Sequence, residues 1–383
     1  MNNPYLKIEN NQYVPFSTAE KSATITYTLG KYVQLLFFPH PLTHDYYPRH
    51  IAKMSWSDWR VILSLLIYLA LLVYGIYTLL KKEIIGFGIL FYLGTLFLVS
   101  NIIFPIGTNM AERFLFMPSI GFCFVVALLL YKYLGTNSLK ENFKKLSTPF
   151  IILGIISLLF AGKTFVRNFV WKDNYTLFTT DIKVSKNSAK LRNSVGGELV
   201  ETFKNEKNAN LKKQKLNEAV AHLKEAIRIH PNYKNAFLIL GNAYNYLQQY
   251  QQSIAAYNNA LRIDPNYEQA RQNLGITYRE AGKYYGEQKN DINNAIKNLK
   301  EAYKILGDTD PETIRLLGVA FGMSGNTQKA ISYFQKLVSL QPNNAGAFWN
   351  LANAYRFAGN LEKENEFRQK AKKINPNIEN EFK

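Results

Sequence analysis

The sequence predicts an all-α protein in two parts, a polytopic bundle of transmembrane helices followed by an α-solenoid of helix pairs. Two observations support this prediction. Long uncharged apolar runs occur only in the first half of the 383 residues, and most are long enough to cross a bilayer. In the second half, pairs of prolines stand 34 residues apart, a period typical of stacked helical repeats.

The membrane part is predicted to contain four spans. Uncharged runs cover residues 61–80, 84–104 and 114–131, with a shorter run at 146–162. At about 1.5 Å per residue, about 20 residues cover the ~30 Å hydrocarbon core. Before these runs, residues 23–42 are apolar and aromatic but contain Lys31. This segment is predicted either to lie in the interface as an amphipathic helix or to form a further span.

Basic residues in the short loops predict the orientation, because such loops tend to stay in the cytoplasm. The loops after the first and third spans contain Lys81, Lys82, Lys132, Lys140, Lys144 and Lys145. The loop after the second span has only Arg113, although Arg49, Lys53, Arg60, Lys163 and Arg167 flank the spans on that side. With four spans, the repeat part and both termini are predicted to be extracytoplasmic. A further span at 23–42 would move the amino terminus inside.

Charge and cysteine content exclude several classes. The net charge of +18 is spread along the chain without a run of five or six basic residues, so no nucleic-acid partner is predicted. The single cysteine, Cys123, cannot form an intramolecular disulfide. The polar residues 1–12 argue against a cleaved signal peptide, so the internal apolar segments are expected to direct the chain to the membrane.

The second half repeats a pattern of large and small residues. Pro231 and Pro265 are 34 residues apart, as are Pro342 and Pro376. In the unit that begins near residue 234, the places where two helices nest are occupied by Phe237, Leu240, Gly241, Tyr244, Tyr257 and Ala260. This is the pattern of tetratricopeptide (TPR) repeats, which are helix pairs of 34 residues, with Ser253 where alanine is usual.

Four such units and one degenerate unit are predicted. The unit after Pro265 carries an insertion near residues 283–290, and the degenerate unit pairs 189–200 with a helix that ends at Pro231. At least three repeats make a stable stack, so this part should fold. The predicted domains are 1–60 as an extracytoplasmic or interfacial segment, 61–166 as about four transmembrane helices, 167–188 as a linker and 189–383 as TPR repeats.

Side chains that the packing pattern leaves free on the first helices are candidates for binding a partner protein or peptide in the concave groove. By register these are Asn242, Asn245, Tyr246, Gln272, Arg279, Arg315, Trp349, Asn353 and Arg356. Asn242 and Asn353 occupy equivalent places, where an amide can pair with both the N–H and the C=O of an extended peptide. Ile276 and Val319 interrupt this ladder. The three arginines favour an acidic or carboxylate-bearing partner, and the alternative is a solvated groove without a specific ligand.

No motif for catalysis or for a cofactor is present. The sequence has no Gly-rich phosphate loop, no nucleophile elbow and no Cys/His zinc spacing, so no cofactor is predicted. His40, His44 and His50 stand close together, and three imidazoles at this spacing can hold a metal. Histidines beside Tyr and Trp more often decorate a membrane interface, and no metal site is predicted.

Glu112 and Arg113 are the sharpest candidates for function in the membrane part. They stand between two uncharged runs, at or near the membrane, where ionisable groups are costly unless they are functional or paired. One interpretation is a mutual ion pair in an ordinary loop. The other is that Arg113, together with Glu112, binds the phosphate of a lipid carrier, to which a planar guanidinium is well suited.

Four stretches of the chain resemble a known family. AERFLFMPSIGFC, LLFFPHPLTHDY, the SDWR before the first span and VRNFVWKDNYTLF before the repeats are similar to the membrane-proximal region of the transmembrane and TPR-repeat-containing O-mannosyltransferases and their bacterial relatives. The resemblance covers essentially the whole chain in the same order. It implies a polytopic glycosyltransferase of the C superfamily, which uses a polyprenyl-phosphate-linked sugar and presents a protein acceptor on an extracytoplasmic TPR stack.

The resemblance also implies that this chain corresponds to the C-terminal portion of the family architecture. Those enzymes place their catalytic acids in the first extracytoplasmic loop, whereas Asp45 and Asp58 match a later region. The chain is therefore expected to be a truncated product, a remnant used as a scaffold or one piece of a split enzyme. Two functions stay open: a glycosyltransferase part that binds a lipid-linked donor and an acceptor protein, and a non-catalytic membrane-tethered TPR adaptor.

Overall fold

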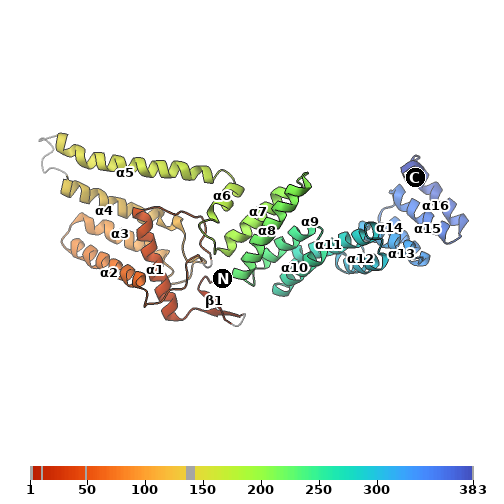
Figure 1. Ribbon diagram of the computed structural model, residues 1–383, viewed down its shortest axis with the longest axis horizontal. Helices are drawn as coiled ribbons and strands as arrows, with labels where there is room; N and C mark the ends of the chain where they lie inside the picture. Colours follow the sequence, from red (N-terminus) through yellow and green to blue (C-terminus); the bar gives the residue numbers. More distant parts are fainter. Residues whose placement is uncertain (1–2, 10–11, 48–49, 135–142, 382–383) are drawn as a thin grey trace. The chain divides into compact units, whose positions relative to one another are not determined.

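The computed structural model describes residues 3–9, 12–47, 50–134 and 143–381, and it confirms the all-α class (Figure 1). Within these residues the strands are confined to one antiparallel hairpin, β1 (Leu6–Glu9) and β2 (Gln12–Pro15), in which Leu6 pairs with Pro15. The chain divides into two compact units. The first contains Met1–Glu198 and Glu225–Pro231, and the second contains Leu199–Lys224 and Asn232–Lys383.

Helices that pack in sequence order form the membrane part of the first unit. They are α1 (Thr18–Phe37), α2 (Trp59–Leu80), α3 (Ile84–Leu98), the 3-10 turn η1 (Glu112–Leu115), α4 (Phe116–Leu134), α5 (Phe143–Val170) and α6 (Asn174–Asp181). Each of α1 to α4 contacts the helix that follows it. Figure 1 shows the α2–α3 loop and the facing ends of α4 and α5 at one end of this bundle, with α6 at the other.

Among the described residues, three helical segments are long and apolar enough to cross a membrane: Trp59–Leu80, Glu112–Lys132 and Phe150–Val170. The segment α1 is not among them. It carries Glu20 and Lys31, and its buried face includes Thr24 and Thr28, whose hydroxyls donate to backbone carbonyls one turn earlier. Of the basic loop residues, Lys140 and Arg49 lie outside the described residues.

The helix α3 is shorter than the uncharged run 84–104 that predicts it. It has 15 residues, which at about 1.5 Å each reach roughly 22 Å instead of the ~30 Å of a hydrocarbon core. The chain turns immediately afterwards, because Ser100 Oγ donates to the carbonyl of Phe97 at 2.7 Å and Asn101 adopts a left-handed φ of 63°. Apolar composition alone therefore overestimates this span.

Glycines allow α3 to approach both of its neighbours. A Cβ on Gly86 would lie 2.5 Å from the backbone nitrogen of Leu79 on α2, and a Cβ on Gly121 of α4 would lie 2.6 Å from the carbonyl oxygen of Gly88. Any larger residue would force these backbones apart, which is the packing rule of helices in lipid, where small residues occupy the contacts. The glycines thus hold α2, α3 and α4 together.

Helix pairs make up the remainder of the chain. They are α7 (Ala189–Phe203), α8 (Ala209–Ile229), α9 (Lys234–Tyr246), α10 (Tyr250–Ile263), α11 (Glu268–Glu287), α12 (Ile292–Leu306), α13 (Pro311–Met323), α14 (Thr327–Leu340), α15 (Ala345–Phe357) and α16 (Leu361–Ile374), followed by the short α17 (Ile378–Glu381). The predicted insertion at 283–290 mostly lengthens α11, and the partner helix begins after the cap residue Asp291.

Ring contacts and one hydroxyl explain the residue pattern of the repeats. A Cβ on Gly241 would lie 2.5 Å from the ring of Tyr257, and a Cβ on Gly318 would lie 2.6 Å from that of Phe334. Glycine at this position therefore admits an aromatic ring from the second helix of the same pair. Ser253, which stands where alanine is usual, is fully buried and donates its hydroxyl to the carbonyl of Gly241 at 2.8 Å. This hydrogen bond satisfies the buried hydroxyl, so serine is tolerated at a position where alanine is usual.

Candidate functional site

The loop of residues 38–47 is fastened to α5 and α6 through one buried carboxylate. Asp181, the last residue of α6, is 0% exposed. Arg167 of α5 donates to its two oxygens at 2.6 and 2.8 Å, and the backbone N–H of His44 donates to Oδ2 at 2.8 Å. The ring Nδ1 of His44 lies 2.9 Å from the same oxygen. Burial opposes ionisation of Asp181, but the hydrogen bonds from Arg167 and His44 outweigh it and lower its pKa to about 2.

Glu112 fastens the same loop to η1. Its Oε1 accepts the backbone N–H of Thr43 at 2.6 Å and the hydroxyl of Tyr46 at 2.9 Å. Thr43 is itself fully buried and accepts a hydrogen bond from the hydroxyl of Ser185 at 2.9 Å. In the described part of the chain no ion pair joins Glu112 to Arg113. The first interpretation of this motif, a mutual ion pair, is therefore not what the structure contains.

Arg113 is exposed beside the engaged Glu112. Its guanidinium lies 5.3 Å from the ring centroid of Phe114. The turn before it is fixed, because the buried hydroxyl of Tyr32 accepts the backbone N–H of Ala111 at 3.1 Å. Arg113 therefore stands at the amino end of a membrane-crossing helix, Glu112–Lys132, with a positive charge that no carboxylate of the described residues neutralises by an ion pair.

Asp45 joins the loop to the beginning of α7. The hydroxyl of Ser188 donates to Asp45 Oδ2 at 2.6 Å and accepts the backbone N–H of Leu191 at 3.0 Å, so it caps the first turn of α7 while it holds the loop. Lys190 Nζ lies 3.5 Å from the other oxygen of Asp45. With Glu112 and Arg167, these contacts bring together three of the four stretches on which the family resemblance rests.

The three histidines of the loop region have separate partners. His40 Nδ1 lies 3.2 Å from Lys163 Nζ, His44 lies against Asp181, and the ring of His50 lies 5.1 Å from that of Tyr46. Across the residues that the structure describes, no group of three or more His, Cys, Asp or Glu side chains gathers to hold a metal.

In the repeats, the predicted amide ladder has its oxygens engaged. Asn242 Oδ1 accepts the hydroxyl of Tyr257 at 2.6 Å and the amide of Asn273 at 2.9 Å. The equivalent Asn353 accepts from Arg368 at 3.2 Å, and the oxygen of Asn245 accepts the hydroxyl of Thr277 at 3.3 Å. The amides therefore connect neighbouring helices through their oxygens, so their –NH₂ groups remain to donate to a peptide carbonyl.

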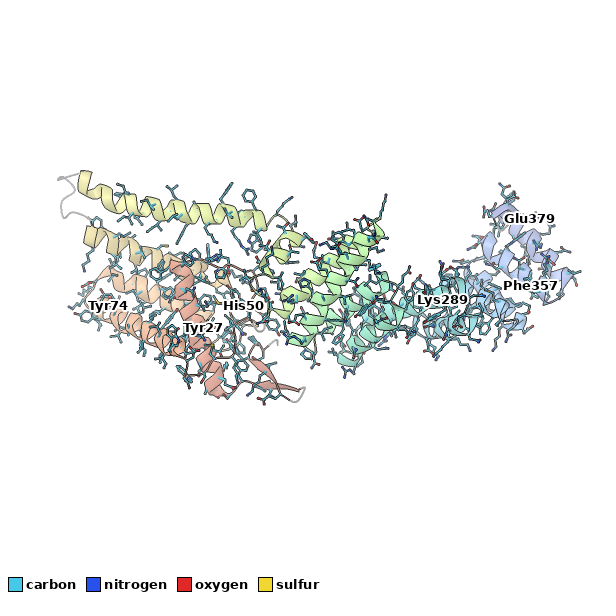
Figure 2. The ribbon with its side chains drawn as sticks, in the orientation of Figure 1. Tyr27, His50, Tyr74, Lys289, Phe357 and Glu379 are labelled. Atoms are coloured by element: carbon cyan, nitrogen blue, oxygen red, sulfur yellow. The ribbon has the colours of Figure 1, made fainter. Side chains whose placement is uncertain are left out.

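The predicted arginines differ from one another. Arg279 pairs with Asp310 at 3.2 Å, and Arg315 pairs with Glu312 at 2.7 Å. Arg356 is exposed and forms no ion pair among the described residues. It precedes Phe357, which is 82% exposed and projects from the end of α15 (Figure 2). Of the three arginines, only Arg356 is thus without an ion pair among the described residues.

Some of the remaining predicted groove residues make contacts within the repeats. Trp349 is only 5% exposed and lies 4.3 Å beneath the guanidinium of Arg368, so it packs in the stack. Gln272 is exposed and donates to Glu268 at 3.1 Å. Tyr246 is 39% exposed, with Lys212 Nζ 5.9 Å from its ring centre.

Sequence reasoning did not find Asp181 or its pairing with His44, which stands 137 residues earlier. No local pattern predicts this contact, because a buried hydrogen-bonded pair has no period along the chain. The only available signal was a carboxylate in the stretch LFTTD, whose apolar neighbours suggest burial.

Comparison with protein-family models agrees with the assignment of TPR repeats to the second half of the chain. The chain matches the models described as TPR repeat over residues 241–282 and tetratricopeptide repeat over residues 315–377. Among solved structures it is similar to YrrB, described as a TPR protein with an unusual peptide-binding site, at 22% identity and a TM-score of 0.37, over 52% of this chain and 92% of that one. Together with the apolar helices, the two family-model matches define a membrane-anchored TPR protein.

Within that class, the chain matches the TMTC family of protein O-mannosyl-transferases over part of its length. It is 39% identical over 150 residues to Protein O-mannosyl-transferase TMTC3 of Homo sapiens, covering 39% of this chain and 14% of that protein. It is 30% identical over 240 residues to Tmtc3 of Drosophila melanogaster, covering 61% of this chain and 24% of that protein. The aligned region thus spans a quarter or less of these two relatives.

Proposed function

We propose that this chain is a part of a protein O-glycosyltransferase of the O-mannosyl-transferase kind. The first unit contributes Arg113 to the site for a polyprenyl-phosphate-linked sugar, and the TPR repeats bind the acceptor protein. The observation that carries this proposal is the contrast between two neighbours. Glu112 accepts hydrogen bonds from Thr43 and Tyr46 through Oε1, whereas Arg113 is exposed at the amino end of the apolar helical segment Glu112–Lys132.

A phosphate is the ligand that best suits Arg113. A guanidinium presents a rigid fork of N–H donors that matches two oxygens of a phosphate, and it stays charged at every physiological pH. Ionisable residues at membrane depth are expected to be functional when they lack a partner. A lipid phosphate would supply the missing negative charge while its hydrocarbon chain stays in the bilayer. Because Glu112 is held by the loop, it acts by positioning the turn that presents Arg113.

An extracytoplasmic location of this site is supported by the charges at the opposite end of the bundle. Lys81 and Lys82 follow α2, and Lys132 stands near the end of α4, on the side of the α2–α3 loop. Basic loops favour the cytoplasm, so Arg113 and the start of α7 belong to the other side. Lipid-linked sugars and an acceptor held by the repeats would then meet on one face of the membrane.

The acceptor is proposed to lie along the groove of the TPR repeats. The amide –NH₂ groups of Asn242 and Asn353 suit backbone carbonyls of an extended peptide, and the exposed Arg356 suits an acidic side chain. All three groups are hydrogen-bond donors, and that of Arg356 also carries a positive charge. None of them is an acceptor. We therefore propose a peptide that is read mainly through its carbonyl and carboxylate oxygens.

Binding of undecaprenyl phosphate to the full chain in lipid nanodiscs tests the donor part. Arg113→Ala is expected to weaken binding about tenfold, because it removes a charge-assisted contact of roughly 1.4 kcal/mol or more. Arg60→Ala is the matched control, since Arg60 also lies at the start of a membrane helix but is paired with Asp58 at 2.6 Å. Equal binding by wild type and Arg113→Ala would contradict the donor site and leave the membrane-tethered adaptor as the function of the repeats.

A further inference from the structure

A polar pocket of about 560 Å³ lies in the repeats, between the pair α13–α14 and the pair α15–α16. Its lining comes from the first turns of α13, the end of α14 and the first turns of α15. The floor is apolar and buried, since Leu337 is 2% exposed and Ala347 is 1% exposed. Polar side chains surround this floor: Glu312, Arg315, Gln341, Asn344 and Asn350.

Glu312 and Arg315, both on α13, neutralise each other at the pocket. Nε and Nη2 of Arg315 donate to the two carboxylate oxygens of Glu312 at 2.8 and 2.7 Å. Arg279, Lys283 and Glu287, whose charges act on this pair, come in both signs. A charged guest would therefore lose water without gaining a free counter-charge, so the pocket favours an uncharged guest.

Three carboxamides supply the remaining polar groups of the lining. Asn344 caps α15, because its Oδ1 accepts the backbone N–H of Ala347 at 3.3 Å, and its Nδ2 donates to Gln341 Oε1 at 2.7 Å. The side chain of Asn350 is half-buried and has no hydrogen-bond partner among the residues that the structure describes. Asn350 therefore offers a guest both a donor and an acceptor.

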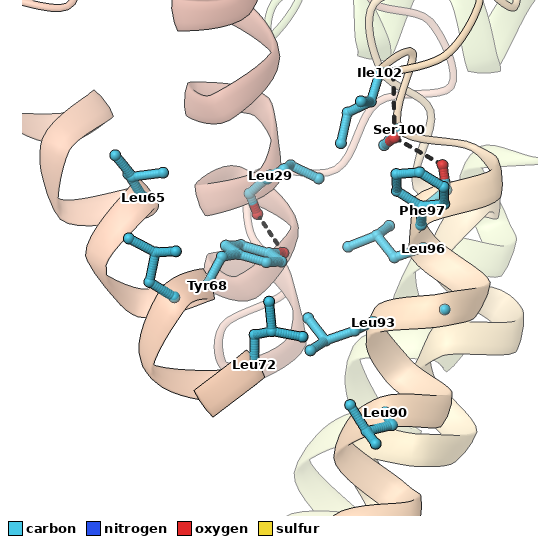
Figure 3. A pocket seen from close by; sticks show the side chains of 12 residues that line it. Leu29, Leu65, Tyr68, Leu72, Leu90, Leu93, Leu96, Phe97, Ser100 and Ile102 are labelled. Carbon is cyan, nitrogen blue, oxygen red and sulfur yellow. Dashed lines mark hydrogen bonds between the residues drawn. The ribbon is translucent and has the colours of Figure 1, made fainter. Parts of the chain in front are cut away.

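A second pocket, between α2 and α3 in the first unit, shows the contrast (Figure 3). It measures about 440 Å³ and is lined mainly by leucines. Its hydroxyls are already engaged, since Tyr68 donates to the carbonyl of Leu29 at 3.0 Å and Ser100 donates to that of Phe97 at 2.7 Å. Such a lining cannot select a guest by hydrogen bonding, whereas the pocket in the repeats can.

We infer that the pocket in the repeats receives the side chain of a glutamine of the acceptor peptide, an inference that rests on the proposed binding of an acceptor by the repeats. A glutamine amide can exchange two hydrogen bonds with the carboxamide of Asn350, one in each direction. A hydroxyl has a single heavy atom and cannot span both polar atoms of that carboxamide. The CH₂ groups of the glutamine pack on Leu337 and Ala347, and its amide carries no charge to be neutralised.

Fluorescence anisotropy with labelled peptides and the full chain in nanodiscs tests this inference. The probe is a glycine–alanine peptide that carries glutamine, glutamate or methionine at its centre, three side chains of similar size. The glutamine peptide should bind about tenfold tighter than the other two, because methionine forms neither hydrogen bond and glutamate lacks the donor. Asn350→Leu should abolish this preference. Asn343→Leu is the matched control, since Asn343 is an exposed asparagine of the preceding turn that does not line the pocket.

Equal binding of the glutamine and methionine peptides to wild type would overturn the glutamine pocket and leave acceptor binding by the repeats in place. A preference that persists in Asn350→Leu would overturn it as well. If Asn350→Leu melts early, Asn350→Asp takes its place, because aspartate keeps the shape, removes the donor and should also lose the preference. Tighter binding of the glutamate peptide would identify a carboxylate site at Arg315 instead. Binding of none of the peptides would contradict both the pocket and the proposed acceptor site.

Discussion

Arg167 of α5 donates to both carboxylate oxygens of Asp181 at the end of α6, 14 residues further along the chain. Asp181 is completely buried and Arg167 is only 15% exposed. The pair is therefore shielded from solvent, and either partner alone would be a buried unpaired charge. Because Asp181 also accepts hydrogen bonds from His44, the pair helps to hold the 38–47 loop, together with Glu112 and Ser188.

Replacement of Asp181 by asparagine should destabilise the first unit by about 3 kcal/mol, since Arg167 loses its counter-charge in a buried place. Thermal unfolding in detergent, followed by circular dichroism, measures the change. Asp173→Asn is the matched control, because Asp173 caps the other end of α6 and asparagine caps a helix equally well. Similar melting temperatures for the two variants would contradict a structural role of the pair.

The contribution of Asp181 to the stability of the first unit should change with pH only in the acid range. Its pKa is lowered from the ordinary value to about 2, so its contribution to stability is complete above the unfolded pKa and is lost as the pH falls through the native one. The difference in melting temperature between wild type and Asp181→Asn should therefore shrink from about pH 4 to about pH 2. A difference that stays constant down to pH 2 would show that charge is not its origin.

Two glycines one turn apart on α13 should respond in opposite ways to alanine. A Cβ on Gly318 would lie 2.6 Å from the ring of Phe334, so Gly318→Ala should destabilise the repeats by about 1–3 kcal/mol through overpacking. A Cβ on Gly322 would meet only Ala330 at 3.9 Å, so Gly322→Ala should stabilise by up to about 1 kcal/mol through helix propensity. Urea unfolding of both variants is the measurement, and equal effects would refute the ring contact.

Asn242→Asp and Asn353→Asp together should weaken binding of an extended acceptor peptide, by about 1–3 kcal/mol if buried amide bonds form. Each change keeps the oxygens that Tyr257 and Arg368 use, removes the –NH₂ donor and puts a negative charge in its place, which repels a peptide carbonyl. Fluorescence anisotropy with a labelled peptide measures the affinity. Unchanged affinity with unchanged melting would exclude these amides from the groove contacts.

Arg356→Glu should weaken binding of a labelled poly-glutamate peptide about tenfold at low salt, with a smaller effect at high salt, because an exposed charge is screened. Arg271→Glu serves as the control, since Arg271 is exposed but donates to the carbonyl of Pro265 at 2.6 Å. If both variants bind the peptide like wild type, the groove does not select acidic partners.

The repeats were predictable because their packing recurs. Each aromatic ring that enters a pair needs a small residue opposite it, so Gly241 and Gly318 stand at matching places in the sequence. The length of α11 was not predictable in the same way. Its extra residues continue a helix without a neighbouring repeat to set a pattern, and in sequence they looked like an insertion.

The polar contacts of the loop were beyond sequence reasoning. Thr43 meets Glu112 across 69 residues, and His44 meets Asp181 across 137. Each such pair depends on its own burial and hydrogen bonding, and no spacing along the sequence repeats from one pair to the next. The motif at Glu112 and Arg113 could be found because two charges between apolar runs are conspicuous. The sequence did not show that Glu112 would be the residue that accepts hydrogen bonds from the loop and that Arg113 would stay exposed.

Ser188 couples the first repeat helix to the membrane part of the first unit. The same hydroxyl caps the first turn of α7 and binds Asp45 in a loop that itself depends on α5, α6 and η1. The complete set of hydrogen bonds at the start of α7 therefore exists only when those helices are packed together. A change that loosens α5, α6 or η1 would in this way also reach the first helix of the repeats.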